Sequence, residues 1–140
     1  MRRSIPILMM AVLAAGGCRG SGDGGDPQEL AGRTWRLQDM AGAAVPADVL
    51  ITAVFAADKV SGNGGCNDYF SDCRFDGGNV SFGRVGATKK FCDGPAGTLE
   101  NVYFDILQRS VRWQLLDDGR LQLVRADGGA LTFLPAGKAD

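Results

Sequence analysis

Short runs of alternating apolar and polar residues, each ended by a turn signal, constrain the fold of this chain more than any other feature. Residues 111–115, 121–123 and 131–133 alternate with a period of two, and Asp118-Gly119 and Asp127-Gly128-Gly129 lie between them. Asp-Gly between alternating runs is the strongest short-range signal for a β-hairpin. Similar runs upstream are expected strands at residues 34–37, 51–55, 59–61, 73–75 and 80–82. The pattern therefore predicts a mainly antiparallel sheet.

One segment has the period of a helix instead. Its apolar residues are Leu99, Val102, Tyr103, Ile106 and Leu107, which share one face of a helix. Pro95 suits the first turn, Asp93 or Gly94 can cap it, and Arg109 near the end favours the helix dipole. We therefore expect a helix over residues 95–109.

These elements predict a mainly β fold, in the form of a small antiparallel, partly open β-barrel with one docked helix. Such a barrel has room for a small apolar ligand or lipid only if aromatic side chains do not fill it. The aromatic residues expected to fill it are Trp35, Phe55, Phe75, Phe82, Trp113 and Phe133.

The N-terminus has the features of an export signal. Arg2 and Arg3 precede an apolar run at residues 5–15, which is too short to span a bilayer as a mature helix. Small residues and Cys18 follow, and residues 15–18 resemble a bacterial lipobox, in which the cysteine is acylated. We therefore expect a signal peptide at residues 1–17 and lipidation at Cys18; an ordinary cleaved signal with a chance cysteine is the alternative.

Residues 18–29 contain no apolar side chain after Cys18 and are expected to form a flexible tether with a reach of roughly 15–20 Å. Residues 30–134 form one domain, followed by a tail at residues 135–140. The 15 basic residues less Arg2 and Arg3 leave 13, against 16 acidic residues. Because this balance is mildly acidic and no basic stripe is present, nucleic acid is not an expected partner.

The glycine-rich stretch Gly62-Asn63-Gly64-Gly65-Cys66-Asn67 is close to a dinucleotide-binding fingerprint. The sixth position is Asn67 rather than glycine, and a strand-like run rather than a helix follows. The glycines are therefore expected to allow a tight corner. Asn67 is expected to support the corner by bonding its own backbone.

Three cysteines remain if Cys18 is acylated, and an oxidising compartment favours one bridge between them. We favour a disulfide between Cys66 and Cys92, worth roughly 3–4 kcal/mol in the chain-entropy model. Cys73 alternates with Phe75 and is expected to be a buried apolar residue. A bridge between Cys66 and Cys73 remains the alternative.

Catalytic and metal chemistry have little support in this sequence. The chain has no histidine, so the usual base for a cysteine nucleophile and a common zinc ligand are missing. Asp68, Asp72 and Asp93 suggest an acid–base pair or a calcium site only weakly, because aspartate is common in turns and no EF-hand spacing is present. Lys89 and Lys90 are expected on a solvated edge strand. We expect no enzyme, cofactor or metal.

Four pieces of the chain together resemble the META domain, or HslJ-like, family of bacterial envelope proteins. They are residues 30–37 (LAGRTWRL), residues 60–67 (VSGNGGCN), Phe82-Gly83 with residues 88–92 (TKKFC), and Leu99-Glu100. They occur in the family's order and span nearly all of residues 30–134.

The resemblance implies a small antiparallel barrel with a helix, frequently on secreted or lipid-anchored proteins, some linked to heat or other stress and to antibiotic tolerance. It brings no catalytic residues. The positions that it carries over are structural: Gly62, Gly64, Gly65, Cys66, Asn67, Thr88 and Cys92. The expected function is that of a non-enzymatic envelope lipoprotein, held by its N-terminal lipid at the periplasmic face of the outer membrane and acting through a protein partner, with binding of a small apolar ligand or lipid as the alternative.

Overall fold

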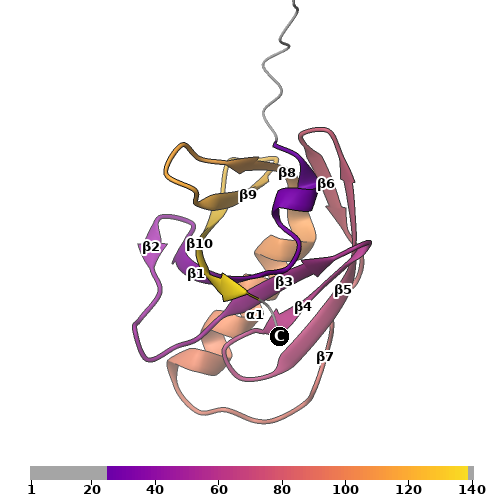
Figure 1. Ribbon diagram of the computed structural model, residues 1–140. Helices are drawn as coiled ribbons and strands as arrows, with labels where there is room; N and C mark the ends of the chain where they lie inside the picture. Colours follow the sequence, from indigo (N-terminus) through magenta and orange to yellow (C-terminus); the bar gives the residue numbers. More distant parts are fainter. Residues whose placement is uncertain (1–24, 139–140) are drawn as a thin grey trace, which may run out of the picture.

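Antiparallel strands are the main elements of the described chain (Figure 1). The computed structural model of the protein describes residues 25–138. The strands are β1 (Arg33–Met40), β2 (Ala43–Ala44), β3 (Thr52–Ala56), β4 (Lys59–Asn63), β5 (Asp68–Asp76), β6 (Asn79–Phe82), β7 (Gly86–Ala87), β8 (Ser110–Leu115), β9 (Leu121–Arg125) and β10 (Ala130–Lys138). A 3-10 helix, η1 (Pro27–Glu29), precedes them, and the helix α1 (Pro95–Arg109) lies between β7 and β8.

The strands close into a barrel because β1 pairs on both sides, with β3 and with β10. The ring runs β1, β3, β4, β5, β6, β8, β9, β10 and back to β1, with β2 and β7 as short additions. Its weakest seam is between β6 and β8, where Asn79 pairs with Arg112 and the Trp113 N–H donates to the Gly78 carbonyl at 3.0 Å. The structure thus confirms the predicted antiparallel barrel with one helix, and the thin pairing at this seam is its nearest approach to an opening.

Inward-facing residues of successive strands form one continuous core. The buried aromatic side chains are Trp35, Phe55, Tyr69, Tyr103, Trp113 and Phe133. Phe75 is half-buried and contacts Phe55 and Trp113 edge-on, at ring-centroid separations of 5.8 and 5.3 Å. Leu30, which follows η1, is completely buried, and its carbonyl accepts a hydrogen bond from Trp35 Nε1 at 3.1 Å. Four of the six aromatic residues expected inside are buried, while Phe75 and Phe82 lie at the core's margin.

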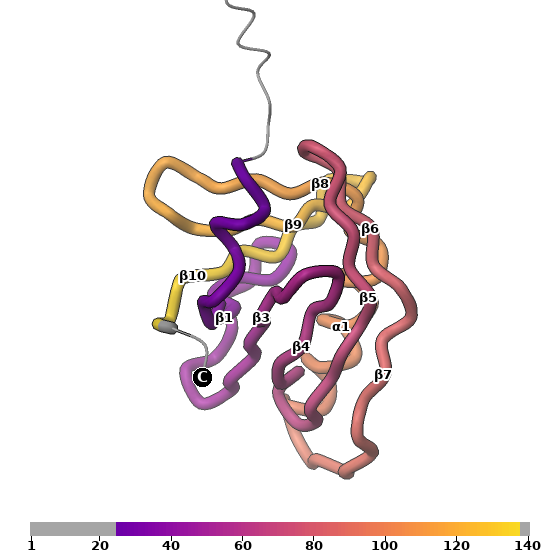
Figure 2. Tube along the Cα trace, turned by 45° about the vertical axis from the view of Figure 1, so that its right-hand side comes forward, coloured from indigo at the N-terminus to yellow at the C-terminus, as the bar shows by residue number. Residues whose placement is uncertain are grey.

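The helix α1 has the predicted bounds, and Figure 2 follows the chain from β7 into it. Gly94 forms the N-cap with a φ of 80°, and no side chain caps the first turn. Tyr103, Ile106 and Leu107 are buried against the barrel, as the apolar periodicity predicts. Ser110 adopts extended backbone and starts β8, so the helix ends there.

Several local expectations differ from the structure. Asp26 caps η1 by accepting from the Gln28 N–H at 2.9 Å, so residues 26–29, which were expected to belong to the flexible tether, are part of the folded domain. The strand β10 continues to Lys138, past residue 134, because it pairs with β1 as far as Arg33. The signal peptide and Cys18 lie outside the described residues.

The aspartates of β5 were expected in turns, and that expectation is wrong. Asp68 and Asp72 lie in β5 and pair with β4 across the ladder. Lys59 Nζ lies 2.7 Å from Asp72 Oδ1, and this hydrogen bond and the lysine charge lower the pKa of the Asp72 carboxyl. Lys89 and Lys90 lie in the loop before α1 and not on an edge strand.

Candidate functional site

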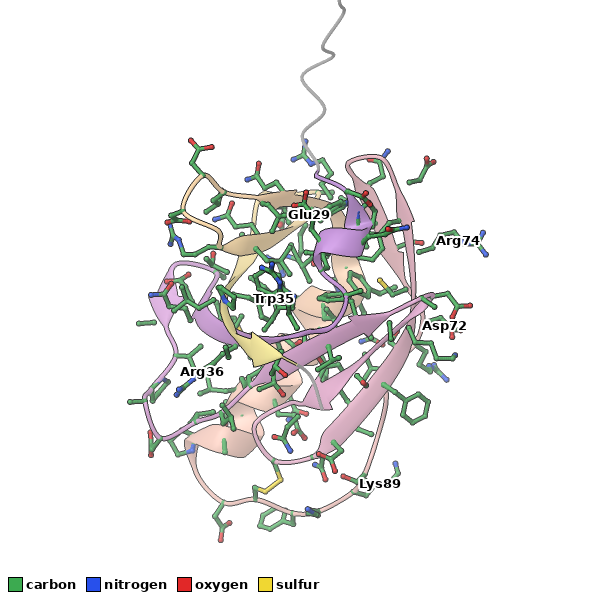
Figure 3. All side chains as sticks on the ribbon, viewed as in Figure 1. Glu29, Trp35, Arg36, Asp72, Arg74 and Lys89 are labelled. Atoms are coloured by element: carbon green, nitrogen blue, oxygen red, sulfur yellow. A yellow bond between two sulfur atoms is a disulfide. The ribbon has the colours of Figure 1, made fainter. Side chains whose placement is uncertain are left out.

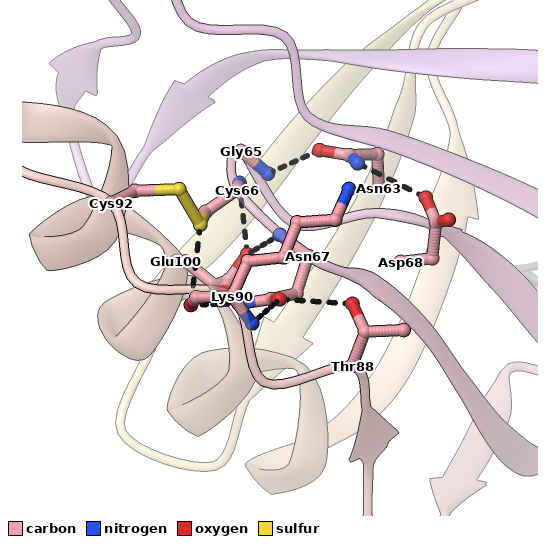
Figure 4. Close-up of a disulfide and its surroundings, with 9 residues drawn as sticks. All are labelled: Asn63, Gly65, Cys66, Asn67, Asp68, Thr88, Lys90, Cys92 and Glu100. Carbon is pink, nitrogen blue, oxygen red and sulfur yellow. Dashed lines mark hydrogen bonds between the residues drawn. A yellow bond between two sulfur atoms is a disulfide. The ribbon is translucent and has the colours of Figure 1, made fainter.

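The corner, residues 63–68, joins β4 to β5 and holds most of the predicted motif positions (Figure 4). The Gly64 N–H donates to the Asn67 carbonyl at 2.8 Å, which closes the turn. Asn63 supports it from the side, because its Oδ1 accepts from the Gly65 N–H at 2.8 Å and its Nδ2 donates to Asp68 Oδ1 at 3.1 Å. The glycines therefore form a hairpin corner, and no helix N-terminus follows them to receive a phosphate.

The three glycines are needed for two different reasons. Gly65 has a φ of 113°, a conformation that L side chains rarely adopt. Gly64 is buried, and a Cβ there would lie 2.7 Å from the ring of Phe104. A Cβ on Gly62 would overlap the backbone carbonyl of Thr52 in β3. Gly62 and Gly64 thus permit close packing rather than an unusual turn.

Asn67 links the corner to the segment before α1. It is buried, and its Oδ1 accepts from Thr88 Oγ1 at 2.9 Å and from the Lys90 N–H at 2.7 Å. Its Nδ2 donates to Glu100 Oε1 at 2.7 Å and to the Lys90 carbonyl at 3.2 Å. The expectation that Asn67 bonds its own backbone is therefore wrong, because all four bonds of its amide reach other segments. The bond from Thr88 Oγ1 also explains why Thr88 is one of the motif positions.

Glu100 is the central residue of the site and was not singled out from the sequence beyond its place in the Leu99-Glu100 pair. Its side chain is buried on α1, and Oε2 accepts from the backbone N–H groups of Cys66 and Asn67 at 2.9 and 2.5 Å. Together with the Nδ2 of Asn67 these groups give Glu100 three donors from the corner. Two adjacent N–H groups directed at one carboxylate oxygen form a strong attachment between helix and hairpin.

The Cys66–Cys92 disulfide completes the attachment, with the Cα atoms 6.0 Å apart. This result confirms the predicted pairing and removes the alternative bridge between Cys66 and Cys73. The bond joins the corner to the segment just before α1, so a covalent link and the Asn67 bonds hold the same segment.

Cys73 is the free cysteine of the described residues, and it is buried in β5. Burial raises the pKa of its thiol to about 12. Because the thiolate is the reactive species, we expect no reaction of Cys73 with thiol reagents in the folded domain, and full labelling once denaturant unfolds it. The comparison uses protein that begins at residue 25 and is treated with the thiol reagent, without reductant, in its folded and in its denatured state. Mass spectrometry then measures how much of Cys73 is labelled in each state. Rapid labelling of the folded domain would show that the strand opens.

Two tyrosines share a buried hydrogen bond beneath the corner. The hydroxyl groups of Tyr69 and Tyr103 are 2.6 Å apart, and Tyr69 donates to the Thr52 carbonyl at 2.8 Å. Tyr103 therefore donates to Tyr69, which gives a directed chain from α1 through β5 to β3. Burial raises the pKa of both hydroxyls above 10.0.

These raised pKa values predict lability in alkali. The unfolded tyrosines lose their protons near pH 10 while the folded ones keep them, so the unfolded state binds fewer protons and stability falls as pH rises above about 10. The chain has two tyrosines, so its ultraviolet tyrosinate signal reports on this pair alone. We expect the signal to appear together with unfolding in an alkaline titration. Gradual tyrosinate formation near pH 10 in a domain that stays folded would contradict the buried pair.

Aromatic contacts in the core determine how much room the barrel has for an apolar ligand. Tyr103 contacts Phe133 in the core and the half-buried Phe104 at its margin, with ring centroids 6.3 and 5.8 Å apart, and the ring of Tyr69 lies 5.3 Å from that of Phe104. A hollow of about 400 Å³ lies at the surface, beside charged residues such as Asp58 and Arg74. The residues described by the structure contain no group of three or more side chains that could hold a metal ion. None of their helices is long and apolar enough to cross a membrane.

Figure 3 shows the side chains on the whole barrel, with the disulfide at the end opposite η1. A small antiparallel barrel, with one helix attached to a glycine-rich corner by a disulfide and a buried glutamate, defines the class of this protein. The META domain model matches residues 28–138. The chain belongs to the META domain family.

Three solved structures share this fold. A protein from Burkholderia xenovorans, determined by NMR, is 31% identical over 78% of this chain and 85% of its own, with a TM-score of 0.63. A second NMR structure is 22% identical, covering 79% of this chain and 95% of its own, with a TM-score of 0.65. A DUF4847 family protein from Bacteroides vulgatus shares the fold at 17% identity, covering 83% of this chain and 100% of its own, with a TM-score of 0.57. No curated protein matches the chain.

Proposed function

We propose that the protein is a non-enzymatic lipoprotein of the bacterial envelope, anchored through acylated Cys18 at the periplasmic face of the outer membrane. In this proposal the META domain acts in envelope stress or drug tolerance by contacting a protein partner. The N-terminal sequence supports the anchor, since a basic start, a short apolar run and small residues precede Cys18. The part of the expected tether that precedes Asp26 would leave the domain free to meet a partner near the membrane.

The observation that carries the proposed mode of action is that the site is fully engaged internally. Both oxygens of Glu100 and every polar atom of the Asn67 amide are used in bonds that hold the corner. Within the described residues, no buried side-chain nitrogen or oxygen lacks a hydrogen-bond partner. A site of this kind fixes a surface rather than transforms a substrate, so the outer surface is the part available for function.

Replacing Cys18 with serine tests the proposal as a whole. The Cys18→Ser protein is expected to lose metabolic labelling with a palmitate analogue and to leave the membrane fraction, since a serine cannot form the thioether of the anchor. A strain that makes only this form should show the same sensitivity to envelope stress and antibiotics as a deletion strain. Cys73→Ser is the matched control, since it changes a different cysteine and should keep both lipid and location. A deletion strain with unaltered tolerance would contradict the proposed role.

A further inference from the structure

The loop of residues 88–94, between β7 and α1, presents an unusual surface. Phe91 is 88% exposed, more than any other large apolar side chain of the described chain. Lys89 and Lys90 precede it and are also exposed. Neither lysine forms an ion pair with another described residue, although five such pairs occur elsewhere in residues 25–138. An aromatic ring and two lysines that take part in none of these ion pairs thus lie together in solvent, and the exposed Asp93 two residues after the ring leaves the loop with one excess positive charge.

This loop is held in place on both sides of the exposed ring. Before it, the backbone N–H and carbonyl of Lys90 bond to the Asn67 side chain. After it, Cys92 is joined to Cys66. A fixed backbone loses little conformational entropy when it docks, so a ring presented in this way binds at a lower cost than a ring on a flexible loop. The bonds between Asn67 and Lys90 and the Cys66–Cys92 disulfide therefore preorganise the backbone that carries Phe91.

The position of the loop indicates which direction it faces. In Figures 1 and 2, η1 and the loop before α1 lie at opposite ends of the barrel, and Figure 3 places Lys89 at the end far from Glu29. A domain tethered by its N-terminus therefore presents the loop away from the attachment point. This favours a partner other than the bilayer that holds the anchor.

We propose that the 88–94 loop is a docking surface for an envelope protein that offers an apolar pocket for Phe91, rimmed by carboxylates that pair with Lys89 and Lys90. The inference rests on the proposed function, because it names the surface and the chemistry of the partner. Aromatic anchors that enter a desolvated pocket dominate the energy of many interfaces, and charged rims speed association and select the partner. A hollow of about 360 Å³ between this loop and the start of α1 receives a side chain of the partner in return. The loop is small, so the complex is transient.

Site-specific photocrosslinking in cells that make the full chain tests the surface. A photoreactive phenylalanine analogue replaces Phe91 in one variant and Phe70, which is 61% exposed on β5, in a matched variant. We expect a discrete protein adduct from position 91 and none from position 70. An adduct by itself does not establish the docking surface. The captured protein is therefore purified, and its affinity for the lipid-free domain is measured.

The measured affinity decides the inference. Phe91→Ser is expected to weaken binding about tenfold or more. Lys89→Gln with Lys90→Gln is also expected to weaken binding, and to remove most of its dependence on salt concentration. Phe70→Ser should leave binding unchanged, and all variants should unfold at the temperature of the parent. Unchanged affinity in the loop variants overturns the inference.

Other outcomes separate the inference from the proposed function. An adduct from position 70 alone overturns the docking surface and leaves a protein-mediated function standing. An adduct between two copies of the chain, or loop-dependent binding to phosphatidylglycerol vesicles without any protein adduct, overturns the heterologous protein partner. No adduct from either position overturns the inference, whereas the Cys18→Ser experiment still tests the anchor and the tolerance role independently.

Discussion

Replacing Gly62 with alanine is expected to lower the free energy of unfolding by roughly 2–4 kcal/mol, because the new methyl group would overlap the backbone of the neighbouring strand. The overlap is with the Thr52 carbonyl, and a Cβ would also lie 2.8 Å from the Thr52 carbonyl carbon. No side-chain rotation relieves a clash with backbone. The carbonyl also accepts the Tyr69 hydroxyl, so moving it breaks the tyrosine chain that joins α1 to the sheet.

Chemical denaturation of the Gly62→Ala variant measures this loss of unfolding free energy. In thermal unfolding, the substitution should lower the melting temperature by roughly 10 °C or more. Ser61→Ala is the matched control, because Ser61 is the preceding residue of β4 and its side chain is exposed; its effect should stay within about 0.5 kcal/mol. Earlier tyrosinate formation in alkali should accompany the Gly62→Ala change. A variant as stable as the Ser61→Ala control would show that β3 and β4 separate easily, and that the glycine is not needed for their close approach.

The parts of the fold that sequence could predict are those fixed by local pattern. The helix over residues 95–109 follows from its apolar period, and its N-terminus follows from Gly94 and Pro95. The hairpins at Asp118-Gly119 and Asp127-Gly128 follow from turn chemistry, because those residue types favour the required backbone. Local signals of this kind act over a few residues and need no knowledge of the rest of the chain.

The site could be predicted only in part, because its central bonds join distant segments. Glu100 and Asn67 are 33 residues apart, and a glutamate in the first turns of a helix is ordinarily read as a solvated residue. The sequence predicts the Cys66–Cys92 pairing, yet it does not show that the Glu100 carboxylate is buried against the backbone of Cys66 and Asn67. The signal that could have indicated this role is helical spacing, since Glu100 precedes Tyr103 and Leu107 by three and seven residues and therefore shares their buried face.

Replacing Glu100 with alanine is expected to cost about 3–5 kcal/mol, because it removes the acceptor of two backbone N–H groups and of the Asn67 amide. Glu100→Gln keeps the shape and should cost about 1–3 kcal/mol. If the side-chain oxygen of the glutamine introduced by Glu100→Gln accepts from the backbone N–H groups of Cys66 and Asn67, then the glutamine NH2 group faces the side-chain NH2 group of Asn67. Asn67 cannot rotate to relieve this contact, because its oxygen already accepts from Thr88 and Lys90.

A double-mutant cycle separates this matching of donors and acceptors from a general loss of packing. Asn67→Asp alone places two carboxyl groups together and is expected to destabilise, whereas Asn67→Asp with Glu100→Gln restores a donor opposite an acceptor. We therefore expect the double variant to be more stable than the sum of the single changes predicts, by about 1 kcal/mol or more in the free energy of unfolding. Asn101→Ala, at an exposed position of the same helix, controls for changes in helix propensity and should be near neutral. Strict additivity in the cycle would mean that the two side chains do not share a hydrogen bond, and that the backbone N–H groups of the corner and the disulfide hold this end of α1 without it.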